Sequence, residues 1–384
     1  MLLEDLQAIQ RGVPLSNRIQ FTLSAKAIQT LQQDGQDFYL SDSSTSVPLS
    51  SLVNHLVVQY HSQAHISIAQ QLNQRKKDLE QILSGMSAAS RRIAIQKLLE
   101  NDRLELERWR DELSETIRLS AGAKQRVLIR LSKAAINTLA EHFKKTGPFA
   151  EGQYYNNNIG QYLKFLLEEY VRLSSPRREE IFYGQWLDKI TTAITNGQEL
   201  LVALRSTPTV TSVFRPYAVH LDEESRYHYL LGYWDPQGTG RWQTACLRLN
   251  SLCKVQCESV RSPLTKTERQ KLQRQIAQKG VAYLSGKHTP VTVRVQLTPE
   301  GERLYRSIRH MRPAVVTPPG PDRIYTFSCS AYQAKTYFLR FGKDARILEP
   351  ASLRRQIARF FKGGLEANGE LCPPAFSGRK EQTV

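Results

Sequence analysis

The sequence predicts a multidomain α+β protein with a helical first half, a small β-barrel in the middle and a mixed C-terminal domain. Three observations support this prediction. A strand-and-helix pattern occurs twice in the first half, the periodicity changes from helical to alternating near Glu199, and strands alternate with helices between residues 290 and 363. A chain of 384 residues is also too long for one ordinary hydrophobic core.

The first half contains an internal repeat. Residues 18–31 read RIQFTLSAKAIQTL and residues 126–139 read RVLIRLSKAAINTL, so seven of fourteen positions are identical. Each copy starts with the alternation of a half-buried strand, and a serine then stands where the N-cap of a helix is expected. Apolar residues spaced i, i+3, i+4, i+7 predict a second helix over residues 49–60 and 159–170. We therefore expect a duplicated strand–helix–helix element.

This element resembles the ribbon-helix-helix family, in which two strands pair into a ribbon that enters the DNA major groove. The resemblance implies that outward strand residues read base edges and that the second helix holds a phosphate at its N-terminus. The candidate reading residues are Arg18, Gln20, Thr22, Arg126 and Arg130. Leu128 departs from the polar pattern, so the second copy either reads fewer bases or serves as a scaffold. The strands can pair within one chain or between chains, and the alternative is that both are ordinary edge strands.

Residues 65–118, between the two copies, are predicted to be helical, with a break at Gly85. Their arginines alternate with acidic residues, which favours a solvated face over a track for phosphates. The five arginines concerned are Arg91, Arg92, Arg103, Arg108 and Arg110.

The net charge is the first indication of a binding partner. The chain has 53 Lys and Arg residues against 36 Asp and Glu residues, a formal charge of +17. Such a surplus attracts polyanions, of which nucleic acid is the commonest. A solvated basic surface is the alternative.

Several classes of protein are not expected. No segment approaches 18 uncharged apolar residues, and the N-terminus lacks the pattern of a signal peptide, so we expect a cytoplasmic protein without a membrane partner. The five cysteines form no CxxC pair, and the His61/His65 pair has no evident third ligand, so neither a metal nor a cofactor is expected. No motif of a hydrolase, kinase or metalloprotease is present, which argues against an enzyme.

Four candidate strands lie between residues 200 and 249 and are separated by turn signals, which suggests a small barrel. Residues 198–260 resemble a WYL domain, a small SH3-like or Sm-like barrel named for a Trp-Tyr-Leu run. That run is represented here by His228-Tyr229-Leu230, and Asn250 and Ser251 stand where the family has Asp and Arg.

The WYL resemblance implies a negatively charged ligand, often single-stranded nucleic acid or a nucleotide, whose binding signals to a DNA-binding part. Arginines can hold phosphates in bidentate fashion, and tyrosines offer hydroxyls or stacking faces. Core packing is the alternative for each tyrosine. The candidate ligand-binding residues are Arg215, Tyr217, Tyr229, Tyr233 and Arg248.

The C-terminal alternation of strands and helices predicts a ferredoxin-like α+β unit. It resembles the extension that commonly follows WYL domains and contributes to dimer contact, so a homodimer is expected. The expected division is a first ribbon-helix-helix-like element (1–64), a charged helical connector (65–118), a second such element and a helix (119–195), the WYL domain (196–262), the dimerisation domain (263–363) and a flexible tail (364–384).

Two functions follow from these resemblances. The first is a ligand-sensing, DNA-binding transcriptional regulator of a prokaryotic defence system of the CRISPR type, which reads a palindromic duplex operator. The alternative is a single-stranded-RNA-binding accessory protein, because the domain order resembles the WYL accessory proteins of type VI-D CRISPR systems. In that case the partner would be an RNA-guided CRISPR nuclease.

Overall fold

The computed structural model describes residues 1–39, 49–119, 124–144, 149–222, 225–279, 281, 284, 291–309 and 312–369. The chain divides into two compact units, and the boundary falls within one helix. The first unit comprises Met1–Lys189 with Leu249–Ser251, and the second comprises Ile190–Arg248 with Leu252–Val384. Helices and antiparallel sheets are both present, as the sequence predicts.

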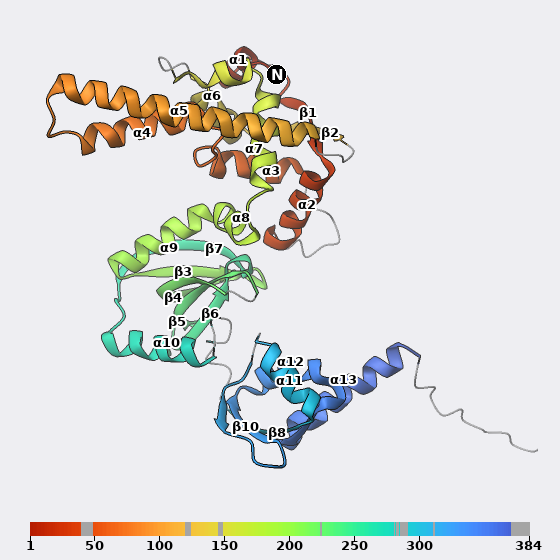
Figure 1. The fold of residues 1–384 in the computed structure, drawn as a ribbon. Coiled ribbons are helices and arrows are strands. Elements are labelled where there is room, and N and C mark those ends of the chain that lie inside the picture. The colour runs from red at the N-terminus through yellow and green to blue at the C-terminus, as the bar shows by residue number, and fades with distance from the viewer. Residues whose placement is uncertain are drawn as a thin grey trace, which may run out of the picture. The chain divides into compact units, whose positions relative to one another are not determined.

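The first unit is helical apart from one two-stranded ribbon (Figure 1). Its elements are α1 (Leu3–Gln10), β1 (Arg18–Ser24), α2 (Ala25–Tyr39), α3 (Leu49–Tyr60), α4 (Ile68–Ile82), α5 (Ala88–Leu119), β2 (Lys124–Arg130), α6 (Lys133–His142), the 3-10 helix η2 (Glu151–Tyr155), α7 (Ile159–Tyr170), α8 (Ser175–Phe182) and α9 (Gly184–Asn196).

The two strands of the internal repeat pair with each other inside one chain. β1 and β2 run antiparallel, with Arg18 opposite Arg130, Gln20 opposite Leu128 and Thr22 opposite Arg126. The alternation predicted from the sequence is present along β1 and in the second half of β2, where Val127 and Ile129 are buried beneath the ribbon. The sequence left open whether the copies pair within or between chains, and the structure places the pairing within the chain.

Each copy also holds the strand–helix junction of the other copy. The Ser24 N–H donates to Glu168 of α7 at 2.7 Å, and the Ser132 N–H donates to Asn54 of α3 at 2.8 Å. Both serines also cap the helices that follow them, as predicted, because each hydroxyl accepts the N–H of the third residue along. The two copies therefore interlock.

The charged connector folds into the helical hairpin of α4 and α5. The break predicted at Gly85 is confirmed, since α4 ends at Ile82 and α5 begins at Ala88. The Ser87 hydroxyl accepts the N–H of Ser90 at the start of α5. The hairpin has its own apolar seam, formed by Ile68, Leu72, Leu79, Ile95 and Leu99.

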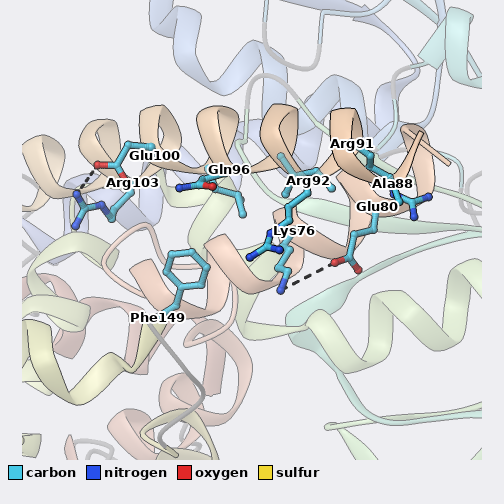
Figure 2. A pocket seen from close by; sticks show the side chains of 11 residues that line it. Lys76, Glu80, Ala88, Arg91, Arg92, Gln96, Glu100, Arg103 and Phe149 are labelled. Atoms are coloured by element: carbon cyan, nitrogen blue, oxygen red, sulfur yellow. Dashed lines mark hydrogen bonds and ion pairs between the residues drawn. The ribbon is translucent and has the colours of Figure 1, made fainter. Parts of the chain in front are cut away.

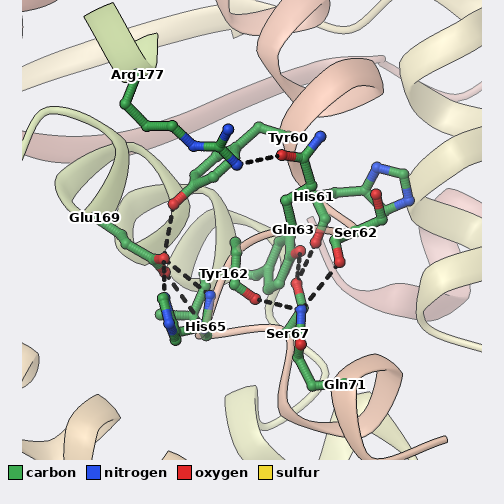
Figure 3. Close-up of polar contacts among 12 residues, drawn as sticks. Tyr60, His61, Ser62, Gln63, His65, Ser67, Gln71, Tyr162, Glu169 and Arg177 are labelled. Atoms are coloured by element: carbon green, nitrogen blue, oxygen red, sulfur yellow. Dashed lines mark hydrogen bonds and ion pairs between the residues drawn. The ribbon is translucent and has the colours of Figure 1, made fainter. Parts of the chain in front are cut away.

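A buried carboxylate fixes the turn between α3 and α4 (Figure 3). Glu169 of α7 accepts hydrogen bonds from the Tyr60 hydroxyl at 2.7 Å and from the backbone N–H groups of His65 and Ile66 at 2.9 and 3.1 Å. His61 and His65 lie in this turn, past the end of α3, so they do not share a helix face. The four-residue spacing of the two histidines therefore belongs to a turn that Glu169 stabilises.

The second unit begins with an antiparallel five-stranded sheet. Its strand order is β6-β5-β4-β3-β7, so the last strand returns beside the first. One face of this sheet packs against α10 through Leu231, Tyr233, Leu264 and Leu272. The elements are β3 (Gln198–Leu204), β4 (Thr207–Leu221), β5 (His228–Asp235), β6 (Gln243–Arg248), the 3-10 turn η3 (Leu249–Ser251, grouped with the first unit), β7 (Leu252–Arg261) and α10 (Lys266–Lys279).

An antiparallel four-stranded sheet of order β11-β8-β10-β9 follows. Its core contains Val293, Phe327, Tyr337 and Leu353. The short strand β9 was not predicted, and the last helix continues through Gly363 to Ala367, past the predicted start of a flexible tail at residue 364. Residues 370–384 of that tail lie outside the described residues. The elements are β8 (Val291–Leu297), α11 (Pro299–Ser307), β9 (Val315–Thr317), β10 (Ile324–Cys329), α12 (Ala331–Phe338), the 3-10 helix η5 (Leu339–Asp344), β11 (Ala345–Glu349) and α13 (Ala351–Ala367).

Among the described residues, no helix combines the length and the apolar character that a membrane-spanning helix needs.

Candidate nucleic-acid interface

The residues predicted to read bases lie together on the outer face of the ribbon. Arg18, Gln20, Arg126 and Arg130 are exposed, and Thr22 is half-buried. Strand pairing brings Arg18 next to Arg130 and Thr22 next to Arg126. In the part of the chain that the structure describes, none of the three arginine side chains forms an ion pair, so their guanidinium groups remain available to an external anion.

Leu128 lies at the centre of the same face. Its side chain is 58% exposed, and it stands opposite Gln20. A large apolar side chain surrounded by arginines has no partner in the core to explain its position. In a major groove, such a side chain is suited to contact the C5-methyl group of thymine, and a glutamine is suited to adenine.

One end of this face forms the floor of a hollow of about 700 Å³ between β1, α5 and the start of α7. Its lining includes two cations and no carboxylate among the described residues: Gln20, Phe21, Thr22, Ser114, Arg126, Asn158, Gly160, Gln161, Lys164 and Phe165. Two cations without an acidic group make this hollow suitable for an anion.

The start of α7 lies next to the ribbon at Gly160. A Cβ atom at Gly160 would lie 3.4 Å from the backbone oxygen of Gln20 and 3.5 Å from Ile19. The Asn158 side chain caps α7 by accepting the Gln161 N–H. The N-terminus of this helix, with its partial positive charge, therefore adjoins Arg126 and Thr22.

Lys164 is a candidate residue that the sequence analysis missed. It lines the hollow and has no ion-pair partner in the described part of the chain. The repeat could have pointed to this residue, because Lys164 corresponds to an uncharged residue, Asn54, in the first copy. The Asn54 amide is occupied by the backbone oxygens of Ser50 and Arg130, so only the second copy presents a free cation at this position.

A second, larger hollow of about 880 Å³ lies along the α4–α5 hairpin (Figure 2). Its floor includes the buried Ile95 and Leu99, and Phe149 borders it. Figure 2 shows the side chains of Lys76 and Arg92 close together, with the ring of Phe149 beside α5. The lining is Lys76, Glu80, Ala88, Arg91, Arg92, Ile95, Gln96, Leu99, Glu100, Arg103 and Phe149.

The charges of this hollow differ in how they are paired. Arg103 pairs with Glu100, and Lys76 lies 4.0 Å from Glu80. Arg91 and Arg92 form no ion pair with any described residue. The rim therefore carries unpaired positive charge above an apolar floor.

Phe149 also borders a third hollow, of about 550 Å³, whose lining includes His61, His142 and Lys144. The imidazole rings of the two histidines lie 5.6 Å apart, edge to face. Burial and the neighbouring His142 lower the pKa of His61 to about 4, so this ring is neutral near pH 7. The ring of Phe149 thus separates a basic hollow from a polar one.

In the second unit, the five predicted ligand-binding residues gather on one face of the sheet. Arg215 pairs with Tyr233 across β4 and β5, and Arg248 pairs with Tyr229 across β5 and β6. Tyr217, Tyr229 and Tyr233 all contact the apolar cluster that α10 completes. Helix α10 therefore covers much of the face that the sequence analysis assigned to a ligand.

Arg215 is engaged by internal contacts. Its guanidinium donates to Glu268 of α10 at 2.9 and 3.1 Å and to the carbonyl oxygens of Ser262 and Pro263, and the residue is buried. It also lies over the ring of Trp242. A ligand phosphate would have to displace Glu268. Arg248, whose guanidinium lies 3.1 Å from the ring centre of Tyr227, is more exposed.

Comparison with known proteins bears on the four-stranded sheet and its helices. Residues 289–363 match the family model described as the WCX domain. This part of the chain is similar to a WCX domain. This WYL-related domain includes β8 to β11 and all of α13 except its last turn.

The fold around the WCX domain also has a solved counterpart. A structure described as "Crystal structure of a CRISPR Cas-related protein" aligns with a TM-score of 0.66 at 20% identity, covering 94% of this chain and 96% of that one. The two chains therefore share a fold over nearly their whole length. The WCX match supports the predicted resemblance to WYL-domain proteins in this part of the chain, and the solved counterpart shows the fold alone.

Two further comparisons add little to the WCX assignment. The proteasome accessory factor B/C (PafBC) of Arthrobacter aurescens aligns at 14% identity over 94% of this chain and 66% of that one, but a TM-score of 0.27 is too low to indicate a common fold. No curated protein matches the sequence.

Proposed function

We propose that this chain is a nucleic-acid-binding regulator whose ribbon reads duplex DNA and which catalyses no reaction. The observation that carries the proposal is the outer face of the ribbon, which lies beside a hollow without carboxylates. There Arg18, Gln20, Arg126 and Arg130 are exposed, and the three arginines form no ion pair with any residue that the structure describes. Arginine and glutamine make the commonest bidentate contacts to guanine and adenine. Lys164 and the start of α7 would hold a phosphate of the same duplex.

Each of the three sheets has a proposed fold family. The interlocked β1–α2–α3 and β2–α6–α7 elements are a ribbon-helix-helix pair contained in one chain. The five-stranded sheet is an SH3-like or Sm-like barrel, since its last strand returns beside its first. The strand order 4-1-3-2 of the last sheet, β11-β8-β10-β9, is the ferredoxin-like order, and this domain is proposed to form a homodimer.

The five-stranded sheet is the proposed sensor for a negatively charged ligand. Arg248 with Tyr227 and Tyr229 is the proposed candidate for its site, because Arg248 is more exposed than Arg215 and lies over the ring of Tyr227. A role in a CRISPR-type defence system is proposed from the description of the protein that shares the fold.

The reading role can be tested on a duplex that the wild-type chain selects from a randomised pool. Replacing both Arg18 and Gln20 with Ala is expected to weaken binding to that duplex at least about tenfold, because each lost bidentate contact contributes roughly 1–3 kcal/mol. Fluorescence anisotropy measures this change. The matched control replaces Lys97 and Arg108, two exposed residues of α5 that do not line the hollows described above. Equal losses in the two variants would contradict the reading role.

A second candidate function, an accessory protein that binds single-stranded RNA, is favoured by the hollow of the α4–α5 hairpin. A polynucleotide strand could place phosphates on Arg91 and Arg92 and stack a base on Phe149. This geometry suits unpaired bases, because the bases of a duplex are already stacked. A CRISPR effector would be the partner in this case.

Binding of single-stranded RNA by the α4–α5 hairpin predicts an effect that does not involve the ribbon. Replacing Arg91 and Arg92 with Ala is expected to weaken binding of an oligouridine of about 12 nucleotides, a length within the range that single-strand sites cover. The expected loss is about tenfold, with duplex binding unchanged, and anisotropy titrations of both nucleic acids measure it. Replacing Lys97 and Arg108 removes the same charge from the same helix. If this control lost as much affinity for the single strand, the hollow would have no specific role.

A further inference from the structure

The ribbon has its own pseudo-twofold axis. The repeat relates residue 18 to residue 126 and residue 22 to residue 130, with an offset of 108. In the paired strands, Arg18 lies opposite Arg130, and Arg126 lies opposite Thr22. Exchanging the two copies therefore converts one pair into the other. At the centre, Gln20 lies opposite Leu128, its own counterpart in the repeat.

The side chains on the outer face break this symmetry at two of the three positions. Arg18 and its counterpart Arg126 are alike, but Thr22 corresponds to Arg130 and Gln20 corresponds to Leu128. These substitutions change the chemistry that a base pair would meet. Glutamine pairs with adenine, an exposed leucine suits the thymine methyl group, and arginine rather than threonine prefers guanine.

The flanks of the ribbon are also unequal. At one end, Lys164 has a free ammonium group next to Arg126, among the residues the structure describes. At the other end, the corresponding Asn54 is committed to the backbone of Arg130 and Ser132. The backbone next to Gly160 is open to the hollow, whereas its counterpart Ser50 carries a side chain whose oxygen lies 3.4 Å from the Arg130 nitrogen. One end is therefore better built to hold a phosphate.

From these differences we infer that a single chain reads a duplex sequence that is not its own reverse complement. The inference rests on the proposed reading of DNA by the ribbon. Gln20 and Leu128 give a preference for an A·T pair at the centre of the site. Because Thr22 and Arg130 differ, the base preferred on one side of the centre differs from the base preferred on the other side. Arg126 and Lys164 fix the direction in which the ribbon lies on the duplex. A palindromic operator, which the sequence analysis expected, would then require two chains, each contributing an asymmetric half.

The test is selection from a pool of duplexes with a randomised centre too short for two ribbons. The wild-type chain is expected to enrich an asymmetric sequence. A variant that carries both Thr22→Arg and Leu128→Gln has identical outward residues in the two copies, so its selected sequence is expected to become palindromic. The variant that replaces Lys97 and Arg108 with Ala is expected to retain the wild-type sequence.

A single substitution guards against failure of the symmetrised variant to fold. Leu128 is exposed, so Leu128→Ala leaves the core intact. It is expected to reduce the preference for thymine at one central position about fourfold, the effect of one buried methylene-sized group, and to leave the other positions unchanged. Thermal melting followed by circular dichroism verifies folding of each variant.

The outcomes separate the inference from the proposed function. Enrichment of a palindrome by the wild-type chain, or an unchanged preference for thymine in Leu128→Ala, would overturn the inference while leaving DNA reading intact. Failure to enrich any duplex would overturn the proposed function itself.

Discussion

His61 shows how a single half-buried side chain makes the stability of the first unit depend on pH. Its ring lies in the turn after α3, next to His142, and burial lowers its pKa to about 4 from an unfolded value of 6.5. The unfolded chain therefore binds more protons than the folded chain between these two pH values. Stability due to His61 is complete above about pH 6.5 and is lost as the pH falls toward 4.

We expect His61→Gln to flatten this dependence. The wild-type chain should lose up to about 3 kcal/mol more than the variant between pH 6.5 and pH 4, the value that corresponds to the shift in pKa. Urea unfolding followed by circular dichroism at several pH values measures the difference. If the two proteins lost stability in parallel over this range, His61 would not be the group responsible.

Leu128 and Arg215 mark the limits of prediction at the residue scale. The sequence showed that Leu128 departs from a polar pattern, but only the register shows that it lies opposite its own counterpart. Arg215 fitted a phosphate-binding role by type and position. Its partner Glu268 lies 53 residues further along the chain, and no local pattern predicts such a pair.

At the scale of elements, Gly232 permits the close approach of β5 to β4. A Cβ atom at this position would lie 2.2 Å from the backbone oxygen of Arg215 and 2.7 Å from the ring of Phe214. The backbone of β4 would have to move to relieve this clash. Gly232→Ala is therefore expected to destabilise the second unit by roughly 2 kcal/mol or more.

Gly320 provides the control for this prediction. It belongs to the same unit, and its added Cβ would meet nothing within 4 Å. Gly320→Ala should therefore change the free energy of unfolding by no more than about 0.5 kcal/mol. Chemical denaturation of the two variants would show equal effects if the close approach at Gly232 were unimportant.

Elements with a clear periodicity of apolar residues could be predicted from the sequence, and short or mostly polar elements could not. Both ribbon strands, their serine caps and the break at Gly85 follow from local patterns that the fold retains. Strand β9 has only three residues, all exposed, so it shows no alternation of buried and exposed positions. Helix α10 is mostly polar, and the few apolar residues that cover the tyrosine face are too sparse to predict its place.

At the scale of the whole chain, the duplication is the feature that organises the first unit. The sequence predicted two copies and a net charge of +17, but it could not show which strands pair. The choice depends on the interlocking contacts of Ser24 with Glu168 and of Ser132 with Asn54, which join residues more than 75 positions apart. Pairing within the chain places a complete ribbon on every molecule.

The most direct test of the account is the salt dependence of duplex binding. Replacing Lys164, the proposed phosphate contact beside the ribbon, with Ala removes one neutralised phosphate, so the slope of log Kobs against log salt should become shallower by about 0.9. The control that replaces Lys97 and Arg108 should keep the wild-type slope. Identical slopes for the wild type and the Lys164 variant would show that nucleic acid does not bind beside the ribbon.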